Sequence, residues 1–187
     1  KICGSQSIIS GLIKDKYSNK IIYGGTSNEG HLIQEASTPQ PIKNMNGNVV
    51  LIPQDVVNCI GINDPIYWHD LGDVDYGLRA LKNGIKVMST RKAIANGYSN
   101  GQMCRIRKWG TNIYNRFKKL YSPLGSNPSI AFYFRKKHYG IISAIALYIY
   151  LHLINIFPDF IVKLVWGEKY VENNKIITKK HCNYVSN

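Results

Sequence analysis

Four of the chain's 11 acidic residues fall within twelve positions, at Asp64, Asp70, Asp73 and Asp75, and the aromatic pair Tyr67-Trp68 and His69 lie among them. A carboxylate can remove a proton from a hydroxyl nucleophile, which is general-base catalysis. Trp68 offers a flat apolar face of the kind that stacks on a sugar ring. The same residues also fit a structural interpretation, in which the two later aspartates cap a helix and Trp68 packs in the core. Both interpretations stay open on the residues alone.

The elements around these acids are short and well bounded. Asp73–Lys82 is predicted to form a helix, with aspartates in its first turn, basic residues in its last turn and Gly84 after its end. Gln54–Ile60 is predicted to form a short amphipathic helix between Pro53 and Gly61. Strands are predicted at Cys3–Ile13, Ile21–Tyr23, Asn46–Pro53 and Ile85–Ser89, and an irregular surface loop at Thr26–Ile42.

Length and composition limit the class of protein. The chain has 187 residues, 44% of them hydrophobic, so it can bury a real core, and its length is typical of one domain. The four cysteines, Cys3, Cys59, Cys104 and Cys182, form no C-x-x-C pair. A structural zinc site is therefore not expected, and the spacing favours free thiols in a reducing cytosol.

The net charge of +13 is concentrated in three basic runs, 105–108, 116–119 and 135–138. Because Trp109, Tyr114 and Phe117 lie among the first two runs, a nucleic-acid-binding module is an alternative. However, the sequence shows no helix-turn-helix, zinc-finger or RNA-binding motif, and the acidic cluster would repel phosphate. No nucleic-acid partner is expected.

An apolar stretch of 17 residues without formal charge runs from Ile141 to Phe157. A membrane-spanning helix needs roughly 20 apolar residues, so three interpretations stay open: a buried helix that covers the sheet, a helix at a membrane interface, or a spanning helix. The basic run that precedes it suits anionic head groups. Residues 135–157 are therefore candidates for peripheral membrane contact.

Several motifs, in order, resemble the C-terminal half of family 2 glycosyltransferases. The motifs are Tyr23-Gly-Gly-Thr, Asn46-Gly-Asn-Val-Val-Leu-Ile-Pro, Asp64-Pro, His69-x-x-Gly-Asp-Val-Asp-Tyr-Gly-Leu-Arg-Ala, Lys82-Asn-Gly-Ile-Lys, Ser122-Pro-Leu-Gly and Phe132-Tyr-Phe-Arg-Lys-Lys-His-Tyr-Gly. The family consists of inverting GT-A enzymes, and the bacterial surface-polysaccharide type is the most similar. The resemblance runs from roughly Gly4 to Pro158.

The resemblance implies a role for each matching residue. Asp73 occupies the position of the general base, Asp75 that of a second acid which orients the helix or a neighbouring group, and Gly72 a position that is often Glu. Trp68 and His69 would line the acceptor pocket, and Asn46 and Gly47 would lie near the reaction centre, where glycine allows close backbone approach. The substrates implied are a nucleotide-sugar donor and a glycan or lipid-linked acceptor. The implied location is cytoplasmic, at the inner face of the plasma membrane.

The chain departs from the family pattern in two ways. A metal-binding His is common after the strand that follows the acidic helix, whereas Asn96, a weaker ligand, stands there. In addition, the half that binds the donor is missing. That half carries an Asp-x-Asp motif and most of the ligands of the divalent cation (Mg²⁺ or Mn²⁺). A non-catalytic remnant of such an enzyme is therefore a further alternative.

The expected fold class is α/β, with a partial GT-A-like mixed sheet flanked by helices and a helical C-terminal extension. Residues 1–100 would form the acceptor-side part of the glycosyltransferase domain and 101–168 a basic and apolar helical extension. Residues 169–187 would form a polar tail.

Overall fold

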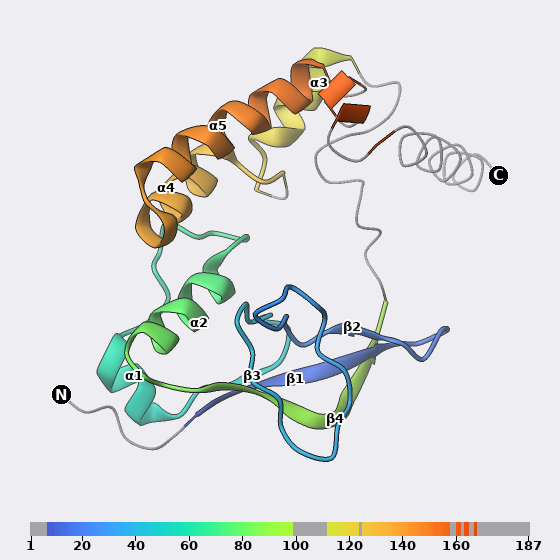
Figure 1. The fold of residues 1–187 in the computed structure, drawn as a ribbon, viewed down its shortest axis with the longest axis vertical. Helices are drawn as coiled ribbons and strands as arrows, with labels where there is room; N and C mark the ends of the chain where they lie inside the picture. The colour runs from blue at the N-terminus through green and yellow to red at the C-terminus, as the bar shows by residue number, and fades with distance from the viewer. Residues whose placement is uncertain are drawn as a thin grey trace. The chain divides into compact units, whose positions relative to one another are not determined.

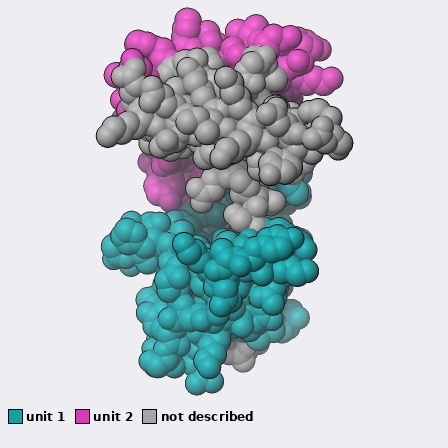
Figure 2. Space-filling model, turned by 90° about the vertical axis from the view of Figure 1, so that its right-hand side faces the viewer, with its two compact units in different colours: residues 1–100 teal, residues 101–187 magenta. Residues whose placement is uncertain are grey.

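The computed structural model describes residues 7–98, 112–123 and 125–157, together with residues 160, 161, 163, 164 and 167. The chain divides into two compact units, residues 1–100 and residues 101–187 (Figure 2). The predicted polar tail 169–187 and the basic run 105–108 lie outside the described residues.

The first unit is built on a four-stranded mixed sheet with β1 (Ile8–Asp15) at its centre (Figure 1). β4 (Val87–Gly97) runs parallel to β1 along its whole length. β2 (Ile21–Tyr23) and β3 (Val50–Leu51) both pair with β1 in the antiparallel sense, on the edge opposite β4. The prediction of a mixed sheet is confirmed.

Two helices belong to this unit, α1 (Gln54–Ile60) and α2 (Gly72–Lys82). The bounds of α1 agree with the prediction, and α2 starts one residue before the predicted helix. Tyr76 and Ala80 of α2 are buried with Ile8, Leu12 and Val87 in one hydrophobic core. Because residues two apart on a strand share a face, Ile8 and Leu12 turn the same face of β1 toward this core. The core therefore fixes the position of the acidic helix on the sheet.

The strand β4 is much longer than the predicted Ile85–Ser89 strand, and its pairing with β1 contains an irregularity. Ser10 pairs with Ser89 but Leu12 pairs with Ala93, so β4 contains extra residues at this point. The side chain of Thr90 fills the gap, because its Oγ1 accepts the backbone N–H of Leu12 at 3.0 Å and donates to the Lys92 carbonyl at 2.8 Å. The Thr90 hydroxyl therefore takes the place of backbone hydrogen bonds between β1 and β4 at this point. Beyond it, the polar residues up to Gly97 continue as strand.

The outer edge of β4 is covered by the predicted irregular loop. Ile42 donates its N–H to the Val87 carbonyl at 2.8 Å, and Ala36 donates to the Arg91 carbonyl at 3.0 Å. Glu35 extends this cover, since its carboxylate accepts the N–H of Ala93 at 2.8 Å and pairs with Lys14 at 2.9 Å. These bonds occupy backbone groups that an open sheet edge would leave available for pairing with another chain.

The second unit contains three described helices, α3 (Ile113–Leu120), α4 (Pro128–Tyr139) and α5 (Ile141–Ile156). α4 begins with proline at its first position and meets α5 at Gly140, whose φ of 88° lets the chain turn between the two helices. Leu120, Phe134, Leu151 and Ile154 are buried in this unit. No helix among the described residues is long and apolar enough to cross a bilayer.

One expectation about the cysteines is wrong. Cys59, on α1, is disulfide-bonded rather than a free thiol. The other three cysteines lie outside the described residues. Absence of a C-x-x-C pair in the sequence excludes only local pairing, because a disulfide depends on which Cα atoms the fold brings within about 7 Å.

Candidate functional site

The site is organised around Asp73, which lies in the first turn of α2. Its carboxylate is half-buried and accepts two backbone hydrogen bonds: Oδ2 from the N–H of Gly47 at 2.7 Å, and Oδ1 from the N–H of Val74 at 2.8 Å. The first N–H groups of a helix lack partners within the helix, so an acid in this turn is stabilised there. Asp73 is thus held from two sides without being removed from solvent.

Gly47 approaches Asp73 so closely that a side chain would not fit. A Cβ added at Gly47 would lie 2.8 Å from the Cβ of Asp73. A second close approach occurs on the same helix, because a Cβ on Gly77 would lie 3.0 Å from the Cβ of Met45. The segment from Met45 to Gly47 therefore packs directly against α2, and a side chain would force a shift at Gly47 and a tight contact at Gly77.

Asn46, between these two contacts, is fixed by its backbone. Its carbonyl accepts the hydroxyl of Ser10 at 3.0 Å, and its side-chain Oδ1 accepts the N–H of Asn48 at 3.3 Å. The hydroxyl of Ser10 is fully buried on β1. The sheet, the Asn46-Gly47 segment and the start of α2 thus meet at one place, and the structure brings together three of the expected site residues.

Asp75 has a different environment from Asp73. It is fully buried, with Oδ1 accepting the Tyr67 hydroxyl at 3.2 Å and Oδ2 paired with Arg79 Nε at 2.9 Å, one helical turn later. Arg79 also donates to the carbonyls of Ile60 and Ile62 at 2.6 and 2.8 Å. Asp75 therefore links the loop that precedes α2 to Arg79.

Sequence reasoning missed Tyr67 and Arg79 as parts of this network. The four-residue spacing of Asp75 and Arg79 was a readable signal, since such pairs face each other on a helix. Tyr76 strengthens the same junction: its hydroxyl donates to the Gly61 carbonyl at 2.9 Å, and the Arg79 guanidinium lies 4.8 Å from its ring centroid. Burial raises the pKa of the Tyr76 hydroxyl, so it stays protonated and able to donate.

The loop that carries Trp68 and His69 leaves both side chains exposed. Trp68 is 78% exposed, so the interpretation in which it packs in the core is wrong. The loop ends at Leu71, which adopts a left-handed conformation with φ of 67° just before α2. Such a backbone is unfavourable for leucine and is found where the surrounding structure imposes it. Here it turns the chain abruptly from the exposed aromatic loop into the acidic helix.

Asn96 stands where the resemblance places a metal-binding His, and it lies on β4. It is exposed on β4 in register with Lys14, whereas the Asn46 carbonyl is bonded to Ser10. Four residues separate Ser10 from Lys14 along β1, or roughly 13 Å at 3.3 Å per residue. No group of three or more His, Cys, Asp or Glu side chains in the described part of the chain could hold a metal ion.

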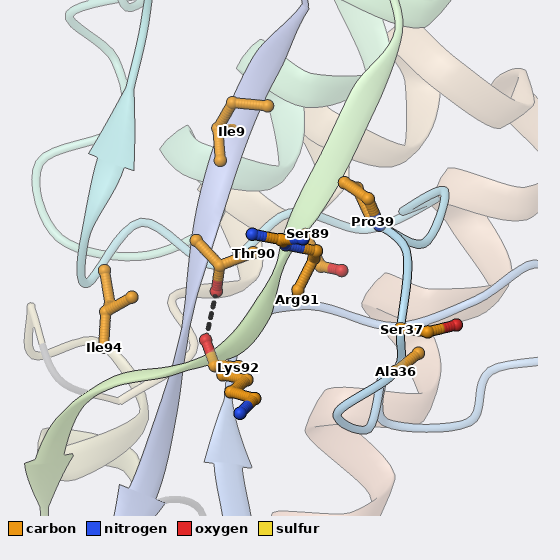
Figure 3. A pocket seen from close by; sticks show the side chains of 9 residues that line it. All are labelled: Ile9, Ala36, Ser37, Pro39, Ser89, Thr90, Arg91, Lys92 and Ile94. Atoms are coloured by element: carbon orange, nitrogen blue, oxygen red, sulfur yellow. Dashed lines mark hydrogen bonds between the residues drawn. The ribbon is translucent and has the colours of Figure 1, made fainter.

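A pocket of about 630 Å³ lies away from Asp73, between β1, β4 and the loop on the outer edge of β4 (Figure 3). Its lining combines apolar side chains with hydroxyls and two cations, and it includes no residue of the acidic loop. The lining residues are Ile9, Ala36, Ser37, Pro39, Ser89, Thr90, Arg91, Lys92 and Ile94. The Thr90 irregularity that lengthens β4 therefore also shapes this pocket.

Comparison of the chain with protein-family models, with curated proteins and with solved structures finds no match. The function is accordingly inferred from the residues, their geometry and the resemblance of the sequence motifs.

Proposed function

We propose that this chain is the acceptor-side part of an inverting glycosyltransferase of the GT-A type, in which Asp73 is the general base. The observation that carries the proposal is the contact of Gly47 with Asp73. A half-buried carboxylate is held by two backbone N–H groups, directly after a loop that exposes an indole and an imidazole. The sequence resemblance assigns these same positions to the acceptor site.

The reaction proposed is a single displacement. Asp73 takes the proton of an acceptor hydroxyl, and that oxygen forms a bond to the anomeric carbon of a nucleotide-sugar on the face opposite the leaving group. The bond from this carbon to the diphosphate oxygen breaks, and the nucleoside diphosphate leaves with the electron pair. A positioned general base contributes about 10²- to 10⁴-fold to such a rate. The donor and the divalent cation that the resemblance implies would be held by the other half of such an enzyme.

Trp68 and His69 would meet the acceptor in this proposal. An exposed indole buries apolar sugar C–H groups against its face, and an imidazole can donate or accept a hydrogen bond with a hydroxyl. Asp75 would contribute indirectly, because its contacts with Tyr67 and Arg79 fix the loop that presents these two side chains.

Binding of the acceptor can be tested on this chain without a donor. The full chain is applied to an array of bacterial surface glycans and glycolipids, beside the variants Trp68→Ala and Tyr17→Ala. Tyr17 is the matched control because it is 82% exposed on the β1–β2 turn. We expect the chain to bind a subset of glycans, Trp68→Ala to lose at least ten-fold in affinity, and Tyr17→Ala to bind as well as the wild type. Absence of glycan binding, or equal binding by Trp68→Ala, would contradict the acceptor site.

A further inference from the structure

One side of α5 is apolar and exposed along the length of the helix. Ala144, Leu151 and Ile154 are buried, whereas the opposite side exposes aliphatic side chains spaced three or four residues apart. Residues at this spacing share one face of a helix. We call them the α5 apolar face: Ile142, Ile145, Ile149, Leu153 and Ile156.

Such a face is unusual on a protein surface exposed only to water. A helix that is hydrophobic all round is normally buried in a core or in a membrane, yet Ile142 is 82% exposed. Contiguous exposed apolar patches commonly mark a binding surface for protein or lipid. The α5 apolar face is therefore a candidate docking surface.

The charge of the second unit indicates which occupant. Residues 112–157 contain no Asp or Glu, and their cations are Arg116, Lys118, Lys119, Arg135, Lys136 and Lys137. Two of these cations contact α5 near its two ends. At one end Arg135 Nη1 is 3.5 Å from the Ser143 hydroxyl, and at the other Arg116 Nε donates to the Asn155 carbonyl at 2.7 Å.

Aromatic side chains accompany the cations at the α4–α5 corner. Tyr133 and Tyr139 are exposed, and the Lys137 ammonium and the Arg135 guanidinium lie 5.7 and 4.9 Å from their ring centroids. Tyrosine has an apolar ring and a polar hydroxyl, so it is favoured at the boundary between hydrocarbon and water. Lysine and arginine can extend their heads to lipid phosphates while their stems stay in apolar surroundings.

We propose that the α5 apolar face, with the cations of α3 and α4, docks the protein on an anionic lipid bilayer. The helix would lie in the plane of the interface, with its aliphatic side chains among the acyl chains. A second copy packed α5 against α5 would bring the same cations together, and residues 112–157 contain no acid to pair with them. Nucleic acid would attract the cations but would leave the isoleucines in water. An anionic bilayer satisfies both features.

Vesicle co-sedimentation tests this proposal with the full chain. Vesicles of phosphatidylcholine alone are compared with vesicles that contain phosphatidylglycerol at about one third. The variants are Ile145→Gln with Ile149→Gln on the face, and Leu51→Gln with Ile62→Gln as a control pair that is also exposed, in the first unit. A third variant, Lys118→Gln with Lys136→Gln, removes charge only, and thermal melts of every variant establish that it is folded.

We expect binding to the anionic vesicles and much weaker binding to the neutral ones. The Ile145→Gln/Ile149→Gln variant should lose at least ten-fold in partition coefficient, whereas the control pair should bind as well as the wild type. Each lysine removed should cost about five-fold. Binding that is absent, equal on neutral vesicles, or unaffected by the face variant would overturn the proposal. So would a dimer in solution that the face variant dissociates, because a second copy would then be the occupant.

Discussion

Asp73 and Asp75 are two residues apart in the sequence, but their environments separate their roles. Asp73 keeps a solvent-accessible carboxylate that is fixed by backbone N–H groups, and Asp75 is fully buried against Tyr67 and Arg79. A buried, paired acid stabilises geometry, whereas an accessible and oriented acid can exchange a proton with a ligand. The proposed division into a base and a positioning residue rests on this difference.

The close approach of Gly47 to Asp73 gives a prediction at the residue scale. Gly47→Ala places a methyl group 2.8 Å from the Asp73 Cβ, so we expect a loss of about 1–3 kcal/mol in the free energy of unfolding. In an Asp73→Gly background the clash is gone, and the same substitution should cost much less. Chemical denaturation of the four proteins measures the coupling, with Asn48→Ala as the neighbouring control. Equal costs in both backgrounds would show that the contact is absent in solution.

Local signals were enough to predict some elements and insufficient for others. Pro53 and Gly61 correctly predicted the two ends of α1, and the aspartates and Gly84 correctly predicted the helix α2. Such predictions are possible because capping and helix-dipole effects act within one turn. The extent of β4 was not predictable, since it depends on the contact of Thr90 with Leu12, 78 residues away in sequence. The place of Asn96 opposite Lys14 was likewise not predictable, because strand register decides it.

The junction between the aromatic loop and α2 gives a prediction at the element scale. Arg79→Met leaves the buried Asp75 carboxylate without its cation and frees the carbonyls of Ile60 and Ile62, so we expect a loss of about 3–5 kcal/mol. Lys82→Met, in the same last turn of α2 but exposed, should change stability by less than about 0.5 kcal/mol. Thermal and chemical denaturation compare the two. Similar small effects would mean that the ion pair does not hold the loop.

At the scale of the whole molecule, the two units carry different features among the described residues. The first unit assembles the Asp73 site where the sheet, the Asn46-Gly47 segment and α2 meet. The second unit carries the α5 apolar face and its cations. An enzyme that modifies a lipid-linked acceptor would benefit from both, because docking on the bilayer raises the local concentration of that acceptor. The membrane proposal nevertheless stands on its own observations and its own test.

The alternative of a non-catalytic remnant has the same fold, so only a rate can separate it from an enzyme. The interpretation of Asp73 as a simple helix cap also needs a matched comparison. Asp55 provides one, because it is likewise in the first turn of a helix, on α1, and is exposed. If Asp73 acted only as a helix cap, replacing Asp55 or Asp73 would change turnover to a similar extent. If Asp73 is the base, only its replacement would lower turnover strongly.

The most direct test is therefore the rate of nucleoside diphosphate release during glycosyl transfer by a protein in which this chain is joined to the donor-binding half that the proposal requires. Asp73→Asn keeps the size of the side chain and one of its two acceptor oxygens but removes the base. We predict that this variant stays folded and loses about 10²- to 10⁴-fold in turnover, while Asp55→Asn keeps a rate within about two-fold of the wild type. Near-normal turnover in Asp73→Asn, or equal losses in both variants, would contradict the assignment of Asp73 as the base.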